Sequence, residues 1–251
     1  MKYNKIKYYL YILLISLVFS DSSANNATNN GANEILKNIM SRYNQDISFK
    51  IVANINKTKT QMDVDMAWLG ADTADVIRKT WIQLREPKDL EGVNVWIWSL
   101  NNGEVKTWAT KPGSGKKFEI SNKKNNMGLD LSFIQLDESI LDGINVISDT
   151  LSYSDRDCYV VDFYKMRKSR KVGPLSKFWI DVDNYKIYKI QKFDKRGRML
   201  SEAIFEEYSD INFPKKLIIS DTKKKTKTSI VIDYDDKTDF NLDNFNPRDI
   251  K

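Results

Sequence analysis

The residue types that most often perform chemistry are scarce in this chain. The sequence has no histidine, which excludes Ser-His-Asp and Cys-His nucleophilic sites and removes the commonest transition-metal ligand. The single cysteine, Cys158, lies in an alternating apolar stretch, where a small buried side chain is the expected role. The carboxylate pairs Asp155/Asp157 and Asp235/Asp236 lie in turn-like stretches typical of solvated surface. We therefore expect a protein that is not an enzyme, with a carboxylate-pair hydrolase as the alternative.

Three other segments carry residues that are common in binding sites. Residues 113–117 (Gly-Ser-Gly-Lys-Lys) lack the full glycine spacing of a phosphate-binding loop and do not run into a helix, so they predict a hairpin tip. The basic runs 165–171 and 223–227 lie in predicted loops, where they serve solubility or, alternatively, docking on a membrane or a partner. The formal charge of +6 suits anionic headgroups or acidic partners. We expect no cofactor, no metal site and no nucleic-acid partner.

The first two dozen residues are typical of an export signal. Three lysines precede an almost wholly apolar run over residues 8–19, and Ser22-Ser23-Ala24 supplies the small residues of a cleavage site. We predict a signal peptide over residues 1–24, a flexible tether over residues 25–32, and a single domain over residues 33–251 located in the periplasm. An uncleaved anchor helix is the alternative.

The remaining sequence is dominated by alternation of apolar and polar residues. Asn33 is placed to cap a helix with one apolar stripe that extends to Tyr43. From Ile47 the period changes to two, and about eleven antiparallel strands follow. Asn102-Gly103 predicts a hairpin turn between two of them, and residues 112–124 predict a loop.

The predicted strands and helices define a fold class. A meander of this length must curl to limit its exposed edges. Residues 128–143 interrupt it with spacing typical of a short helix. We therefore predict an α+β fold: a strongly curved antiparallel sheet, an incomplete barrel, covered by a long N-terminal helix and a short helical lid.

Bulky aromatic residues are concentrated on the predicted strands. Several strands carry large apolar groups on both faces, so one face could pack the helix while the other lines a ligand cavity. The candidate lining residues are Trp68, Trp81, Trp96 and Trp98.

The order of these features resembles the periplasmic lipoprotein-carrier family of LolA and LolB over most of the chain. Residues 84–92 (Leu-Arg-Glu-Pro-Lys-Asp-Leu-Glu-Gly) are similar to the family's L-x-x-P-x-x-x-x-G turn into a Trp-rich hairpin. Residues 127–132 resemble the segment that opens the lid, and residues 179–181 and 193–197 resemble the late hairpins. Each motif is a turn between strands, and their order and spacing together carry the resemblance.

This resemblance implies a hydrophobic cavity that takes acyl chains without a cofactor. Leu129, Phe133, Leu136 and Ile140 would form its lid, and Arg85 is the candidate for the family's lid arginine. The chain lacks the anchoring cysteine of LolB-like members, which places it closer to the soluble carriers. The implied function is a monomeric periplasmic carrier that takes lipoprotein acyl chains or another lipid from an inner-membrane donor to an outer-membrane acceptor. The alternative is a sensory or regulatory module of the same fold that controls a membrane partner.

Overall fold

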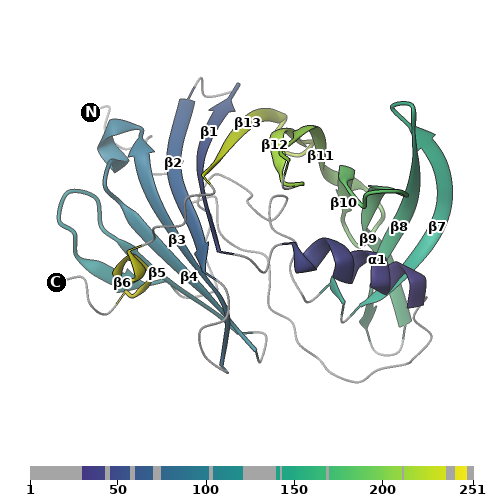
Figure 1. The fold of residues 1–251 in the computed structure, drawn as a ribbon, viewed down its shortest axis with the longest axis horizontal. Coiled ribbons are helices and arrows are strands. Elements are labelled where there is room, and N and C mark those ends of the chain that lie inside the picture. The colour runs from purple at the N-terminus through teal and green to yellow at the C-terminus, as the bar shows by residue number, and fades with distance from the viewer. Residues whose placement is uncertain are drawn as a thin grey trace.

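Within the described residues, thirteen strands form one continuous antiparallel sheet (Figure 1). The computed structural model describes residues 30–42, 46–56, 60–69, 75–101, 104–120, 140–141, 143–167, 170–210, 212–235 and 241–247. The sheet order is β6-β5-β4-β3-β2-β1-β13-β12-β11-β10-β9-β8-β7. The elements are α1 (Asn30–Ser41), β1 (Ile47–Ile55), β2 (Thr60–Leu69), β3 (Val76–Glu86), η1 (Lys88–Leu90), β4 (Asn94–Leu100), β5 (Val105–Thr110), β6 (Lys117–Glu119), β7 (Ile144–Tyr153), β8 (Arg156–Arg167), β9 (Arg170–Asp181), β10 (Ile187–Phe193), β11 (Met199–Tyr208), β12 (Pro214–Asp221), β13 (Thr226–Asp235) and η4 (Leu242–Phe245).

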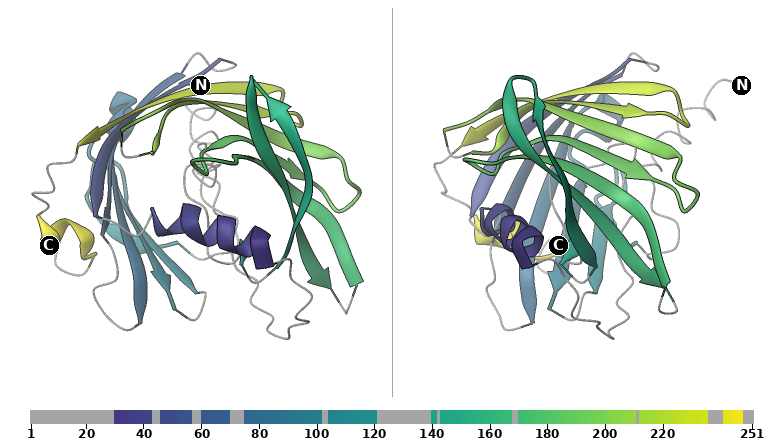
Figure 2. Two further views of the ribbon diagram at one scale, coloured as in Figure 1. Left: turned by 45° about the vertical axis from the view of Figure 1, so that its right-hand side comes forward. Right: turned by 90° about the vertical axis from the view of Figure 1, so that its right-hand side faces the viewer.

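The first and last strands of the chain pair in the middle of the sheet. Ile51 of β1 lies opposite Ile232 of β13 on one side and opposite Val64 of β2 on the other. All other neighbouring strands follow one another in sequence, so their connections alternate between the two ends of the strands. The sheet has two terminal strands, β6 and β7, and it bends around α1 without closing into a barrel (Figure 2).

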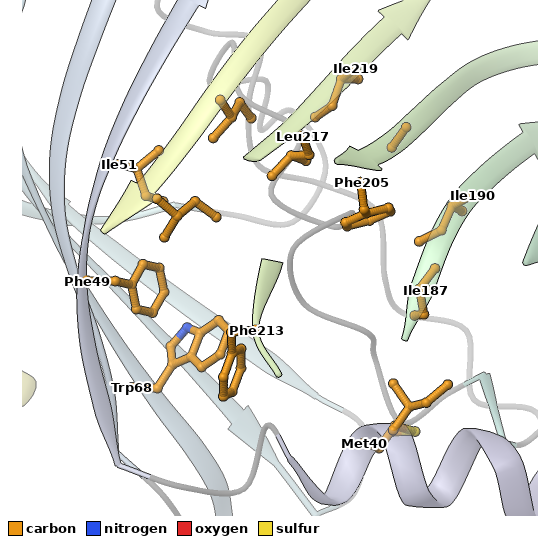
Figure 3. Packing of buried hydrophobic residues seen from close by; sticks show 14 of the residues in the cluster. Met40, Phe49, Ile51, Trp68, Ile187, Ile190, Phe205, Phe213, Leu217 and Ile219 are labelled. Carbon is orange, nitrogen blue, oxygen red and sulfur yellow. The ribbon is translucent and has the colours of Figure 1, made fainter. Parts of the chain in front are cut away.

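One face of the sheet is apolar across most of its strands, and we call it the inner face because α1 packs against it. On β1, buried Phe49 and Ile51 alternate with the exposed Lys50. The apolar face continues across β13 and β12, because Ile230 of β13 lies opposite Leu217 of β12 in the strand pairing. The inner-face cluster also includes Ile82, Leu84, Val95, Ala109, Val161, Phe178, Ile180, Ile187, Ile190, Ala203, Phe205 and Ile219 (Figure 3).

Helix α1 presents an apolar stripe to this face. Its buried residues recur at helical spacing and belong to the same cluster, whereas Glu34 and Lys37 are exposed. The stripe consists of Ala32, Ile35, Leu36, Ile39 and Met40. In the described part of the chain, no helix has the length and apolar character needed to cross a membrane.

The sequence predicted the type of fold better than its details. The antiparallel curved sheet with a helix on one face is confirmed. The count of about eleven strands is wrong, because β6 lies inside the predicted loop 112–124 and its three residues carry too short an alternation to detect. The prediction that Asn33 caps the helix is also wrong, because α1 begins at Asn30. The long N-terminal helix has twelve residues and ends at Ser41.

Candidate functional site

The cover formed by α1 is attached to the sheet by polar contacts at both of its ends. At one end, the fully buried Asn145 of β7 donates from Nδ2 to Oδ1 of Asn33 (2.8 Å) and to the carbonyl of Ile140 (2.7 Å). At the other end, the guanidinium of Arg42 donates to the carbonyls of Asn184 (2.5 Å) and Tyr185 (3.3 Å) in the β9–β10 turn. Between these two points the helix meets the sheet through apolar side chains. The helix is therefore a cover with few specific attachments.

Four aromatic side chains gather on the inner face at the middle of the sheet. The ring of Phe49 lies edge-on to Trp68 with centroids 4.9 Å apart, and Phe213 lies 6.0 Å from Trp68 (Figure 3). Tyr234 completes the group at 5.6 Å from Phe49 and 5.4 Å from Phe213. Its hydroxyl donates to the carbonyl of Pro214 (2.6 Å), so the polar end of this ring is satisfied. We call these residues the aromatic group.

Arg78 places a positive charge next to the aromatic group. It is 6 % exposed, and its guanidinium carbon lies 5.7 Å from the ring centroid of Trp68. A buried cation is costly unless its surroundings compensate it, and the face of an indole ring does so in part. Sequence reasoning missed this residue and selected Arg85 instead, which is exposed and lies on the opposite face of β3. The alternation Val76, Arg78, Thr80, Ile82 was the signal that could have identified it.

Two of the predicted lining or lid residues lie on the inner face. Trp68 is fully buried in the inner-face cluster, and Ile140 belongs to the same cluster with 8 % exposure. Leu129, Phe133 and Leu136 lie outside the described residues.

The other three predicted tryptophans lie on the opposite face, which we call the outer face. On β4, Val95 and Ile97 face the inner cluster, so Trp96 and Trp98 at the alternate positions face outward. Trp81 lies opposite Trp96 in the strand pairing and therefore shares this face. The structure thus separates Trp68 from the other predicted tryptophans by the thickness of the sheet.

Residues 241–247, which we call the C-terminal strap, cover these outer tryptophans. The indole of Trp96 donates to the carbonyl of Asn244 (2.6 Å), and the indole of Trp98 donates to the carbonyl of Phe245 (3.1 Å). The ammonium group of Lys117 donates to the carbonyl of Pro247. Phe245 itself is only 2 % exposed. Sequence reasoning missed the strap; the available signal was the apolar residues Leu242 and Phe245 within a polar C-terminal segment.

A polar pocket also lies at the ends of the strands, beside the β7–β8 and β9–β10 turns. It is open and has a volume of about 400 Å³, and it is lined by Asp155, Arg156, Asp157, Asp181, Asp183 and Asn184. The carboxylate of Asp181 already accepts hydrogen bonds from the backbone of Asp183 (2.9 Å) and Asn184 (3.0 Å), so it stabilises the β9–β10 turn. Within the ranges described, no group of three or more His, Cys, Asp or Glu residues is arranged to hold a metal ion.

Cys158 adjoins this pocket and is fully buried, as predicted. Burial raises the pKa of its thiol above the ordinary value, and the carboxylates of Asp181 and Asp157 raise it further. The reactive thiolate form is therefore disfavoured at neutral pH.

Comparisons with known proteins agree with this architecture. Residues 77–251 match the model of a family described as "Uncharacterized protein". Among curated proteins, no sequence matches the chain.

Three solved structures share most of the fold. One is a protein domain from Vibrio parahaemolyticus described as outer membrane lipoprotein-sorting, with 16 % identity, a TM-score of 0.70, and coverage of 87 % of this chain and 97 % of that one. A DUF1329 family protein from Desulfovibrio piger has 15 % identity and a TM-score of 0.73, with coverage of 88 % and 98 %. A LolA superfamily protein from Nitrosomonas europaea has 16 % identity and a TM-score of 0.63, with coverage of 87 % and 99 %. At these identities the similarity establishes the fold. The chain therefore belongs to the family whose model covers residues 77–251, and it has the fold of the LolA-like outer-membrane lipoprotein-sorting proteins.

Proposed function

We propose that the protein is a periplasmic carrier that binds the acyl chains of a lipoprotein, or another lipid, between the inner face and α1. The observation that carries the proposal is the apolar inner face, which joins both halves of the sheet. It is covered by a helix that meets it through an apolar stripe, with polar contacts at Asn33 and Arg42. The LolA-like fold of the chain supports the same proposal.

The energetics of this arrangement favour exchange between helix and lipid. Burial of an acyl chain contributes about 0.8 kcal/mol per CH₂ group, so a chain of about sixteen carbons contributes roughly 12 kcal/mol. Each polar contact at the ends of α1 contributes only about 1 kcal/mol to stability. The helix also buries its apolar stripe on this face, so an entering acyl chain replaces the apolar contacts of the helix with its own and breaks only these few polar contacts. No covalent step is needed, and none is proposed.

The export signal and the lid complete the proposal. Residues 1–24 would direct the chain to the periplasm, and the mature protein would act as a monomer between an inner-membrane donor and an outer-membrane acceptor. Leu129, Phe133 and Leu136 would close over the bound chain together with the buried Ile140. Trp81, Trp96, Trp98 and Arg85 are not part of the proposed cavity, because they lie on the outer face.

Binding of a fluorescent long-chain fatty acid, followed by displacement with a diacyl lipid, tests the proposal. Adjacent residues of β11 provide a matched pair. Phe205 is buried on the inner face (Figure 3), opposite Leu217 in the strand pairing. Ile204 lies opposite Ile218 and therefore faces the other side of the sheet. We expect Phe205→Ala to weaken binding about tenfold, which corresponds to about 1.4 kcal/mol of lost apolar contact. We expect Ile204→Ala to bind like the original chain. Absence of binding by the unaltered protein, or equal effects of both substitutions in folded protein, would contradict the proposal.

A further inference from the structure

The charged residues of the turns are divided between the two ends of the strands. Because the connections alternate, the β10–β11 turn and the β12–β13 turn lie at one end of the sheet, and the right-hand view of Figure 2 shows them together at one side. These two turns carry exposed cations. We call them the basic rim, and its cations are Lys195, Arg196, Arg198, Lys223, Lys224 and Lys225.

The turns at the opposite end of the strands carry mainly carboxylates. Exposed acidic residues lie in or beside the turns after β2, β4, β7, β9 and β11, namely Asp75, Glu104, Asp155, Asp183 and Asp210. The formal charge of the whole chain is only +6. The strongly positive end therefore arises from segregation of charge along the strand direction, which creates a directed electrostatic field.

Hydrogen bonds hold the two basic turns side by side. The hydroxyl oxygen of Thr222, in the β12–β13 turn, lies 2.7 Å from the carbonyl of Met199 and 2.8 Å from that of Leu200, both after the β10–β11 turn, and its single proton is shared between them. Within that turn, Asp194 accepts from the backbone of Arg196 (2.8 Å) and Arg198 (3.0 Å). Segments 194–200 and 221–227 together contain seven Lys or Arg residues and two Asp residues. The rim is thus a preorganised cationic surface.

Large apolar side chains are exposed next to these cations. Met199 and Leu200 are each 39 % exposed and directly follow the β10–β11 turn. At the same end of the strands, but on the terminal strand β6, Phe118 is 40 % exposed and follows Lys116 and Lys117. Cations combined with exposed apolar groups suit the boundary between lipid headgroups and acyl chains. A purely polar ligand such as a polynucleotide would have no use for the apolar component.

We propose that the basic rim docks the protein on an anionic lipid bilayer. The cations contact the headgroups, Met199 and Leu200 enter the interface, and the acidic end points away from the membrane. A Lys or Arg near an anionic surface strengthens binding about fivefold, so three of them contribute about a hundredfold. This surface is separate from the inner face, so docking does not depend on lipid carriage.

Cosedimentation with vesicles tests the docking surface. We expect the chain starting at Asn25 to bind phosphatidylcholine vesicles that contain about 30 % phosphatidylglycerol, and not vesicles of phosphatidylcholine alone. Binding should weaken strongly between about 0.05 M and about 0.5 M salt, because salt screens exposed charges. We expect Lys223→Glu/Lys224→Glu/Lys225→Glu to lose at least a hundredfold in the partition coefficient.

A matched control changes the net charge equally at positions away from the rim. Lys37, Lys50 and Lys215 are exposed on α1, β1 and β12, and their triple substitution by Glu should lower binding only a few-fold. If the rim variant misfolds by circular dichroism, Lys195→Glu/Arg196→Glu in the neighbouring turn replaces it. Met199→Ser/Leu200→Ser should weaken binding several-fold and leave its salt dependence unchanged.

Three results would overturn the proposal. One is equal binding to neutral and anionic vesicles. Another is an equal loss in the rim variant and its control. The third is binding to a soluble polyanion such as heparin without binding to anionic vesicles, which would identify the rim as a site for acidic macromolecules. If the unaltered protein binds anionic vesicles but not a fatty acid, the docking proposal stands and only the proposed carrier function is contradicted.

Discussion

Removal of the C-terminal strap should destabilise the sheet at the Trp-rich strands. A chain ending at residue 240 loses the burial of Phe245, which contributes about 2 kcal/mol, and three hydrogen bonds that contribute about 1 kcal/mol each. Because water can solvate the freed indoles, these values are net contributions. We expect a loss of about 3–5 kcal/mol, a large part of the 5–15 kcal/mol typical of a folded domain.

Urea unfolding followed by tryptophan fluorescence measures this loss. Trp96 is fully buried beneath the strap, so truncation should also shift its emission to longer wavelength before unfolding begins. A chain ending at Pro247 keeps all three carbonyl acceptors and serves as the control, with an expected change below about 0.5 kcal/mol. An unchanged midpoint and emission maximum in the shorter chain would refute the view that the strap stabilises this face.

Three further predictions concern other parts of the molecule. Substitution of Gly143 by Ala should cost at least about 2 kcal/mol of folding stability in urea unfolding, because the new Cβ would lie 2.1 Å from the ring of Phe163 and 2.9 Å from the carbonyl of Tyr164; equal stability would show that β7 and β8 adjust freely. Cys158 should react slowly with a thiol reagent at pH 8 in folded protein and rapidly in urea, because its raised pKa keeps it protonated. The pKa of Cys158 is higher in the folded than in the unfolded protein, so the protonated thiol contributes stability below about pH 8.5. This contribution is lost as pH rises through the folded pKa, and Cys158→Ala should abolish that pH-dependent loss. Finally, N-terminal sequencing of the protein from cells should find Asn25 as the first residue, and recovery of intact Met1 in the membrane fraction would indicate an uncleaved anchor.

The alternation of residue types predicted the buried face only where one set of positions is polar. On β1, the apolar positions Phe49 and Ile51 identify a buried face directly from the sequence. On β4 both sets of positions are apolar, so Trp96 and Val95 look equivalent in the sequence although they face opposite sides of the sheet. The difference depends on the strap, which contacts β4 across almost 150 residues of sequence. Local patterns do not encode such contacts.

For helix α1, the sequence predicted the apolar stripe correctly but not the first residue of the helix. Its apolar stripe was readable from the spacing of Ile35, Leu36 and Ile39. Its start was misplaced because Asn33 is a good capping residue, whereas in the structure its side chain accepts a hydrogen bond from Asn145 of β7. The competition between a local cap and a distant partner is decided by tertiary packing. Arg78 was missed for a related reason, since a charged residue at a buried position contradicts the ordinary pattern.

The pairing of β1 with β13 has a consequence for how the protein is made. The sheet order runs from β7 to β13 and then from β1 to β6. It is thus the order of an uninterrupted meander in which the first and last strands of the chain meet in the centre. A circular permutant with new termini between β6 and β7, and with the old termini joined, would form every strand pair between neighbours in sequence. In the natural order, β1 is among the first segments synthesised, and its partner β13 is among the last. Pairing of β1 with β13 closes a loop that contains almost the whole sheet. Such non-local pairing is slow, because the chain loses conformational entropy before the contacts between the two strands form. The two halves of the sheet therefore remain unjoined until β13 has been synthesised.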